Sequence, residues 1–341
     1  MKTPRIVSNS KAVSLPFYKK WLEQMLSRNP CFVGDLMLRM GKDNACFPPD
    51  YVKIETTNAC NGRCVYCPRD KMSRRIGIMD FGLFSQIISE LSLWGVAAVH
   101  LQNYGEPLMD PLIAKRVKYA KDKGIRHVNL FTNGMLLTEE AIGELMAAGL
   151  DEINISLDSC DKETHDKMRR NLSYDVIVSN IKTLIGLRKV KNITKPKITL
   201  ASIIHREDNL ATVDFINYWN KLVEEIHFQE AHDWATRELQ KESHKFPCFR
   251  LWSTFTILWD GCVSVCCVDY DGRYILGNVK STPVRQIWNN NEYARMRRLH
   301  LKAAGPQIDL CRNCTLRLKD SPLWIKRLMF LKNSPAKEDN D

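Results

Sequence analysis

Two patterns of apolar and polar positions alternate between Tyr51 and about residue 230. Short runs rich in β-branched and aromatic residues are each followed by a longer run whose apolar residues recur every three or four positions. Thr138 followed by Glu139 is typical of a helix start, and Gly149 of a helix end. The predicted strands are Tyr51–Thr56, Ala98–Gln102, His127–Thr132, Glu152–Leu157, Lys197–Ile204 and Glu225–Gln229, and the predicted helices are Phe81–Trp94, Ile113–Lys123, Thr138–Ala148, Tyr174–Val190 and Asn209–Lys221.

This repeated strand–helix order predicts a parallel sheet with right-handed crossovers. Six units in about 180 residues suit a partial barrel better than a closed eight-stranded one. We therefore predict an α/β fold, a partial (β/α)6 TIM-like barrel. In such sheets the chemistry belongs at the carboxyl ends of the strands.

The segments on either side of the barrel have other patterns. Before it lie one predicted helix, Phe17–Met40, and the Pro48-Pro49 break, while a polar stretch at 231–246 predicts a linker after it. The predicted divisions are 1–50, an N-terminal helical extension; 51–230, the core; 231–318, the linker and a small C-terminal unit; and 319–341, a basic, amphipathic tail.

The small C-terminal unit begins with a predicted β-hairpin. Thr254–Trp259 and Cys262–Val268 are β-rich, and the Asp260-Gly261 pair between them indicates a type I′ turn. One helix is predicted over Pro283–Leu301. The C-terminal unit is therefore a hairpin followed by a helix.

Composition and charge narrow the class of protein. The 341 residues are 44% hydrophobic and carry a formal charge of +11, which excludes a disordered or collagen-like chain. The chain has no uncharged apolar run long enough for a transmembrane or signal segment, so we expect a cytoplasmic protein. Lys and Arg are scattered, which favours a solvated surface, and no nucleic-acid partner is expected.

The 12 cysteines change this picture more than the charge does. Without an export signal, and in a chain too long for a disulfide scaffold, they favour reduced thiols that hold metal. Cys31, Cys46 and Cys160 are isolated, and we interpret them as packing residues.

Three thiols, Cys60, Cys64 and Cys67, follow the first predicted strand directly. Such a loop suits either zinc or an iron–sulfur cluster. No fourth Cys or His follows in Pro68-Arg69-Asp70, whereas structural zinc sites usually close with four ligands. A four-iron cluster held by three thiols keeps one iron open for a small chelating molecule.

This Cys-x3-Cys-x2-Cys loop, with Tyr66 before the last Cys, resembles that of the radical S-adenosylmethionine (SAM) enzymes. The resemblance implies that Cys60, Cys64 and Cys67 hold a [4Fe–4S] cluster whose fourth iron chelates SAM. It also implies reductive cleavage of SAM to a 5′-deoxyadenosyl radical, and a flavodoxin- or ferredoxin-type electron donor. A zinc loop is the alternative.

Residues after other strands agree with this resemblance. The family's Gly-Gly-Glu-Pro motif contacts the SAM amino group, and here Gly105, Glu106 and Pro107 follow the second strand, with Tyr104 in place of the first Gly. The resemblance further implies polar contacts to the SAM ribose and carboxylate from the Thr132-Asn133-Gly134 segment and from Ser156 and Asp158. The last two, two apart on a strand, share a face and can both point into the barrel mouth. For each residue a turn or helix-cap role is the alternative, and for Arg206 the choice is between a carboxylate contact and a surface role.

The remaining six cysteines form a second group. In one regular strand Cys262 and Cys266 would lie about 13 Å apart, so one of them must be left out unless the strand bends. Cys266 and Cys267 face opposite sides of a strand, so normally one of the two points at the metal. The economical set is Cys248, Cys266 or Cys267, Cys311 and Cys314.

From Cys248 to Cys314 the chain resembles the SPASM/twitch extension of radical SAM enzymes, through Trp259-Asp260-Gly261-Cys262, Cys266-Cys267, Leu276-Gly277-Asn278 and Cys311-x2-Cys314. The resemblance implies one auxiliary [4Fe–4S] cluster, and so a cluster-binding C-terminal unit. A zinc ribbon is the alternative.

A fully ligated auxiliary cluster suits electron transfer, which favours oxidation. We therefore predict a radical SAM oxidoreductase that dehydrogenates a small hydroxylated molecule such as a sugar or aminocyclitol. A cysteine hydrogen donor, Cys262 or Cys267, would make it an epimerase. The alternatives are a maturase of a ribosomal peptide, a radical SAM enzyme that modifies tRNA, and a non-catalytic zinc protein that binds nucleic acid.

Overall fold

The computed structural model describes residues 5–6, 36–45, 47–204, 209–230, 247–312 and 314. Of the predicted N-terminal helix it contains residues 36–40, of which 36–39 are helical and Met40 lies in a turn. The rest of that helix, the linker 231–246, the tail, Cys31, Cys46 and Arg206 lie outside the described residues.

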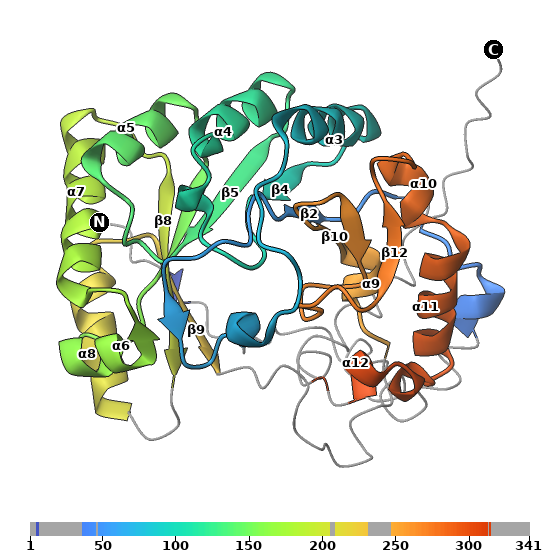
Figure 1. Cartoon of the computed structure of the whole chain (residues 1–341). Coiled ribbons are helices and arrows are strands. Elements are labelled where there is room, and N and C mark those ends of the chain that lie inside the picture. The colour runs from blue at the N-terminus through green and yellow to red at the C-terminus, as the bar shows by residue number, and fades with distance from the viewer. Residues whose placement is uncertain are drawn as a thin grey trace, which may run out of the picture.

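One ten-stranded sheet forms the centre of the molecule, in the order β1-β9-β8-β6-β5-β4-β2-β10-β11-β12 (Figure 1). Its strands are β1 (Arg5–Ile6), β2 (Tyr51–Ile54), β4 (Ala98–His100), β5 (His127–Thr132), β6 (Glu152–Ser156), β8 (Lys197–Ile204), β9 (Glu225–Glu230), β10 (Thr254–Ile257), β11 (Cys262–Ser264) and β12 (Ile275–Asn278). All pairs from β1 to β10 are parallel, and the six predicted barrel strands are consecutive neighbours in this order. The α/β fold with a parallel barrel sheet is thus confirmed.

Helices cover the outer face of the barrel strands (Figure 1). Phe81–Trp94 begins where Asp80 accepts a hydrogen bond from the Leu83 amide at 3.0 Å, and it ends at Gly95 with φ +83°. These caps explain why the sequence predicted this helix so well. The barrel helices are α3 (Phe81–Trp94), α4 (Ile113–Asp122), α5 (Glu139–Ala147), α6 (Lys162–Met168), α7 (Tyr174–Val190) and α8 (Asn209–Trp219).

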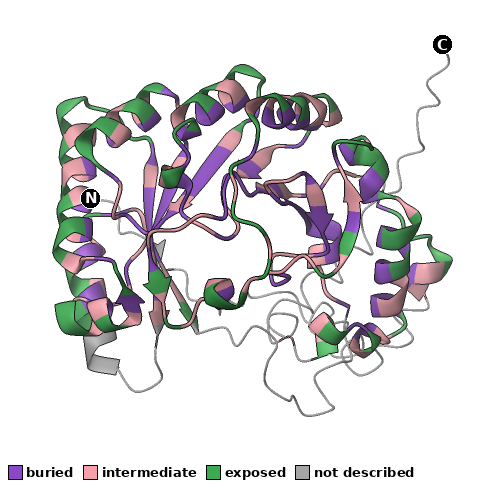
Figure 2. Cartoon of the chain, viewed as in Figure 1, coloured by how far each residue is buried: buried purple, intermediate pink, exposed green. Residues whose placement is uncertain are grey.

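The two faces of the barrel sheet differ in chemistry. Alternate residues such as Ile54, Leu130 and Ile155 are fully buried in the apolar core, and the buried layer follows the strands in Figure 2. Alternation places the intervening residues on the opposite, inner face. There Asn154 donates a hydrogen bond to Asn129 Oδ1 at 2.8 Å. The inner face therefore carries buried polar side chains as well as apolar ones such as Phe131 and Ile203.

The C-terminal unit extends the barrel sheet. β10 pairs in parallel with β2, in the register Thr254↔Tyr51 to Ile257↔Ile54, and β11 and β12 add antiparallel strands beyond it. Sequence patterns gave no sign of this pairing. The predicted hairpin is confirmed by the pairing of β10 with β11, and it lies at the edge of the same sheet as the barrel.

The predicted type I′ turn is wrong. Such a turn needs positive φ at both central residues, but only Gly261 of the Asp260-Gly261 pair has one, at +89°. The Gly261 amide donates to Leu258 O at 2.9 Å, and the Cys262 amide donates to the Asp260 carboxylate at 3.0 Å. The side chain of Asp260 thus stabilises a longer turn.

The predicted helix Pro283–Leu301 is interrupted. It forms α10 (Val284–Trp288) and α11 (Asn291–Leu301), because the Asn290 side chain caps the second helix by accepting from the Tyr293 amide at 2.9 Å. Two short helices, α9 (Arg250–Ser253) and α12 (Asp309–Arg312), complete this unit. Within the described part of the chain, no helix is long and apolar enough to cross a membrane.

Candidate functional site

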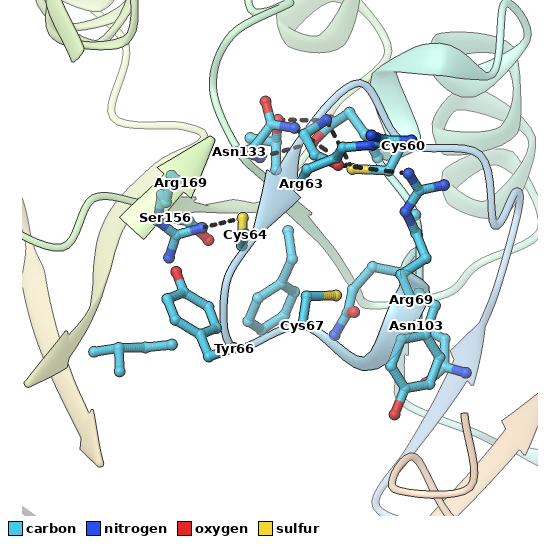
Figure 3. Close-up of a pocket in the computed structure, with 18 of the residues that line it drawn as sticks. Cys60, Arg63, Cys64, Tyr66, Cys67, Arg69, Asn103, Asn133, Ser156 and Arg169 are labelled. Carbon is cyan, nitrogen blue, oxygen red and sulfur yellow. Dashed lines mark hydrogen bonds between the residues drawn. The ribbon is translucent and has the colours of Figure 1, made fainter. Parts of the chain in front are cut away.

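A cavity of about 320 Å³ lies at the carboxyl ends of the barrel strands (Figure 3). Its walls come from the loops after β2, β4 and β5 and from the ends of β6, β8 and β9. It therefore lies where an α/β barrel places its chemistry. Lining residues include the predicted Cys60, Cys64, Tyr66, Cys67, Gly105, Glu106, Asn133 and Ser156, together with Arg69, Gln102, Asn103, Tyr104, Phe131, Arg169, Ile203 and Gln229.

The cysteine loop is held in place by backbone pairing. Within it, β3 (Arg63–Cys64) pairs antiparallel with β7 (Arg169–Arg170), and the Val65 amide donates to Met168 O at 3.0 Å. The Cys67 amide donates to Cys64 O at 3.0 Å, which closes a tight turn between two of the thiols. The three cysteines surround one space in Figure 3.

The donor set fits an iron–sulfur cluster. Burial raises the pKa of the Cys60 thiol to about 11 and also raises the pKa of Cys64 and Cys67, so a bound cation is needed to hold the three as thiolates. Among the described residues, no three Cys, His, Asp or Glu side chains converge closely enough for one metal ion. A [4Fe–4S] cluster spreads its thiolates over separate irons, whereas zinc gathers four ligands on one ion.

Gly105 and Glu106 join the loop after β4 to the cysteine loop. Gly105 has φ +99°, and a Cβ there would lie 2.5 Å from Thr57 O, so only glycine fits. The Glu106 amide donates to Ala59 O at 2.7 Å, just before the first cysteine. The loop that resembles the family's motif therefore packs directly against the chain that presents the thiols.

The carboxylate of Glu106 connects two of the predicted motifs. It is fully buried and accepts hydrogen bonds from Thr132 Oγ1 and the Asn133 amide, both at 2.7 Å. Burial raises the pKa of this carboxyl group to about 7. Asn133 in turn donates to Asn61 Oδ1 at 2.7 Å and lies 4.0 Å from the Cys60 sulfur. The side chains after β4 and β5 thus form one network against the cysteine loop.

Asp158 differs from the expectation that it points into the mouth beside Ser156. Regular strand ends at Ser156, so the alternation no longer applies, and Asp158 is not among the residues that line the cavity. Its carboxylate accepts from Arg169 Nε and Nη2, both at 2.8 Å, and from Tyr66 OH at 2.6 Å. Asp158 therefore lies behind the wall and orients two residues that do line the cavity.

Arg169 is the residue of this site that sequence reasoning missed. It is buried, stacks over the Tyr66 ring at 5.4 Å, and places Nη1 at 3.9 Å from the Cys64 sulfur. In the sequence Arg169-Arg170 resembles an ordinary solvated pair. Only the β3–β7 pairing, which involves two residues from each strand, brings Arg169 to the thiol.

The second group of cysteines gathers around Cys266. Burial raises the pKa of the Cys266 thiol, and the neighbouring thiols Cys267, Cys311, Cys314 and Cys248 raise it further. These residues come from three separate segments of the chain, and such a set of thiols fits an iron–sulfur cluster for the same reasons as the first set. Cys262 lies apart and accepts a hydrogen bond from Asn278 Nδ2 at 3.5 Å.

The expectation that Cys266 and Cys267 face opposite sides of a strand is wrong, because neither residue lies in a strand. β11 ends at Ser264, and the Asp269 amide donates to Cys266 O at 3.2 Å, so both cysteines lie in a turn. Arg250 Nη1 lies 3.9 Å from the Cys267 sulfur. Burial acts to raise the pKa of Cys267, but the charges of Lys53 and Arg250 outweigh it and lower the pKa. The two neighbours therefore have different surroundings.

One tyrosine connects the cavity to the second group. Tyr104 lines the cavity, is 5% exposed, and donates from its hydroxyl to Cys267 O at 2.7 Å. The Tyr104 amide donates to the buried Glu55 carboxylate at 3.3 Å. The same carboxylate accepts two hydrogen bonds from Arg74, at 2.8 and 2.9 Å. The departure from the family's Gly at this position thus links the two sets of thiols.

Family models match both parts of the chain. The radical SAM superfamily model matches residues 54–215, and the model of the iron–sulfur cluster-binding domain called SPASM matches residues 248–315. The first model covers the cysteine loop and the barrel from the last residue of β2 into α8. The second covers the hairpin, the helices that follow it and the second set of thiols.

Curated relatives match mainly over part of their length. A GTP 3′,8-cyclase from Chlorobaculum tepidum is 35% identical over 138 residues, 40% of this chain and 41% of that protein. A tungsten-containing aldehyde ferredoxin oxidoreductase cofactor-modifying protein from Pyrococcus furiosus is 25% identical over 315 residues, 78% of this chain and 87% of that one. The chain spans half the length or less of the two GTP 3′,8-cyclases that match first, 41% and 50%.

Solved structures share the fold. BtrN in complex with AdoMet and 2-DOIA has a TM-score of 0.56 at 19% identity, over 79% of this chain and 93% of that one. SuiB of Streptococcus suis bound to the precursor peptide SuiA has a TM-score of 0.60 at 12% identity, over 86% and 74%. With two family models matched and two sets of thiols in place, the chain belongs to the radical SAM superfamily and is an enzyme with a C-terminal SPASM domain that uses SAM and two [4Fe–4S] clusters.

Proposed function

We propose that this enzyme dehydrogenates a small hydroxylated molecule, such as a sugar or an aminocyclitol. The observation that carries the proposal is the position of Tyr104, which lines the cavity while its hydroxyl holds Cys267 O at 2.7 Å. A second redox centre next to Cys267 would lie directly behind the wall of the cavity. A fully ligated cluster there has no open iron, so its work is electron transfer.

We assign two sets of cluster ligands. Cys60, Cys64 and Cys67 hold the cluster that binds SAM, and Cys248, Cys266, Cys311 and Cys314 hold the auxiliary cluster. We choose Cys266 over Cys267 because Cys266 is the thiol that interacts with the other three. When bound, these groups supply a one-electron reduction of SAM to methionine and a 5′-deoxyadenosyl radical, and an acceptor for one electron from the substrate.

The substrate changes balance in three parts. With SAM and both clusters bound, the carbinol carbon would give a hydrogen atom to the deoxyadenosyl radical and the hydroxyl group would give its proton to solvent. The cluster held by Cys248, Cys266, Cys311 and Cys314 would accept the remaining electron, so that a C=O bond forms. The electron that cleaves SAM comes from a flavodoxin- or ferredoxin-type donor, as the family resemblance implies.

The inner surface of the barrel supports a hydroxylated substrate. Among the polar residues that line the cavity are Gln102, Asn103, Ser156 and Gln229. Amide and hydroxyl groups can exchange hydrogen bonds with the hydroxyl groups of a sugar or cyclitol.

The test uses sugars and aminocyclitols deuterated at single carbinol carbons. Each is incubated anaerobically with the reconstituted enzyme, SAM and dithionite, and both products are examined by mass spectrometry. We expect deuterium in 5′-deoxyadenosine and a product that lacks two hydrogens. A product in which one solvent hydrogen has replaced the deuterium, with no other loss of hydrogen, would instead indicate epimerisation. Deuterium transfer from deuterated peptides only would favour a peptide maturase and contradict the proposal.

A further inference from the structure

Two cations lie against the second set of thiols. Arg250, two residues after Cys248 in α9, places Nη1 at 3.9 Å from the Cys267 sulfur. Lys53 lies on β2, opposite Thr256 of β10, and its charge lowers the pKa of the same thiol. The barrel strand β2 and the C-terminal unit therefore each contribute one positive charge near the Cys267 thiol.

Within the described part of the chain, neither cation forms an ion pair with a carboxylate. Among the same residues, the buried Nε of Arg250 has no hydrogen-bond partner. Glu55, two residues from Lys53, is already bound by Arg74. The titratable groups that raise the pKa of Arg250 are the thiols Cys267, Cys248 and Cys266 and the hydroxyl of Tyr51.

The aromatic residues around Lys53 do not neutralise it. His100 lies opposite Lys53 on β4 and stacks on Tyr51 with ring centroids 4.2 Å apart. Burial and the Lys53 charge lower the pKa of His100 to about 3, so that His100 is neutral at ordinary pH. Uncompensated cations in a partly desolvated place are costly unless a negative group lies beside them. Among the described residues, the thiols themselves can supply this negative charge as thiolates.

We propose that Arg250 and Lys53 are positioning residues that raise the reduction potential of the auxiliary cluster held by the neighbouring thiols. Reduction adds one negative charge to the cluster, and a nearby cation stabilises the reduced form more than the oxidised form. A higher potential favours acceptance of an electron from a substrate radical. This direction of electron flow rests on the proposed function, whereas the effect on the potential does not.

The experiment is a potentiometric titration of the reconstituted full-length enzyme, followed by electron paramagnetic resonance and done without substrate. Four variants are compared with the wild type: Arg250→Gln and Lys53→Met, which remove one charge each, and Arg250→Lys and Lys53→Arg, which keep it. Arg285→Gln removes an exposed charge from α10 of the same unit and serves as the control. Iron and sulfide are counted for every variant.

We expect the auxiliary midpoint potential to become more negative in Arg250→Gln and Lys53→Met, and to stay near the wild-type value in the charge-preserving variants and in Arg285→Gln. The potential of the SAM-binding cluster should not change. A variant that only disturbs the fold would lose iron rather than shift one potential. If Arg250→Gln fails to assemble the cluster, Lys53→Met, which leaves α9 intact, decides the question.

Unchanged auxiliary potentials in variants with full iron content would overturn the proposal, and so would equal shifts of both clusters. The outcome is separable from that of the proposed function. A failure to find deuterium transfer from any hydroxylated molecule leaves the potentials as measured, and unchanged potentials leave the deuterium test standing.

Discussion

The two cysteine sites present similar ligands, but the charges around them differ: both signs at the first site and positive charge at the second. At the first, charges of both signs act on the thiols: Glu106 and Arg69 on Cys60, and Asp158 and Arg169 on Cys64. At the second, the charged side chains that act on Cys267 are the cations Lys53 and Arg250. Mixed charges suit a zwitterion such as the methionine end of SAM, whereas cations of one sign suit a centre that gains an electron.

Removal of the first three thiols is the strongest way to separate the two sites. Replacing Cys60, Cys64 and Cys67 by Ala should abolish formation of 5′-deoxyadenosine, because SAM loses its open iron. The iron of the auxiliary site should remain, which elemental analysis checks. Cys160→Ala, at a half-buried thiol outside both sets, is the control. Retained SAM cleavage in the triple variant would refute the assignment.

Removal of two auxiliary thiols should have a smaller effect on SAM. Replacing Cys311 and Cys314 by Ala should remove about half of the iron, since one of two four-iron clusters is lost, while some SAM cleavage survives. Cys262→Ala, on the hairpin of the same C-terminal unit, should keep the full iron content. An unchanged iron count in the double variant would show that these cysteines hold no cluster.

A variant that breaks the Arg169–Asp158 ion pair tests whether the charges at the first site are positioned for SAM. Arg169→Met leaves Asp158 buried without its partner and should lower the free energy of unfolding by about 3–5 kcal/mol; the exposed fractions of the two side chains are 7% and 2%. SAM binding should weaken about tenfold, because Tyr66 also loses its orientation.

The matched control is Arg116→Met, which breaks a fully buried pair with Asp110 outside the cavity. Urea unfolding and equilibrium dialysis with SAM measure both properties. We expect comparable losses of stability but normal SAM affinity in this control. Equal weakening of SAM binding in both variants would mean that Arg169 contributes only to the fold.

The smallest predicted effect concerns the tyrosine between the sites. Tyr104→Phe removes the hydrogen bond to Cys267 O and should cost about 1 kcal/mol of unfolding free energy. Hydrogen exchange of the amides around Cys267 should accelerate. Tyr274→Phe removes a hydroxyl that accepts from the Asp309 amide at 3.2 Å, away from the cavity, and should leave those amides unchanged. If both variants behave alike, Tyr104 does not couple the sites.

Local patterns predicted the barrel elements well. The strand Lys197–Ile204 and the helices Phe81–Trp94 and Tyr174–Val190 match their predicted bounds, because the local pattern of apolar residues is clear there. The thiols Cys60, Cys64 and Cys67 also share a cavity, as their spacing after a strand indicated.

Long-range contacts account for what the sequence did not reveal. The parallel pairing of β10 with β2 joins residues about 200 positions apart, and no local pattern specifies which edge a hairpin extends. Asp158 contacts Arg169 because it lies beyond the end of its strand. Cys266 lies in a turn because β11 ends before it, at the bulge between Val263 and Ser264 and the hydrogen bonds of Asp269. Each outcome depends on partners distant in sequence.

The most direct test of two cluster sites in one chain is the amount of iron, sulfide and zinc after anaerobic reconstitution, with 5′-deoxyadenosine followed on addition of SAM and dithionite. We predict about eight irons and eight sulfides per chain, no zinc, and 5′-deoxyadenosine. About four irons with one zinc would contradict the auxiliary cluster and remove the electron acceptor. Zinc alone, without 5′-deoxyadenosine, would contradict the account of both sites.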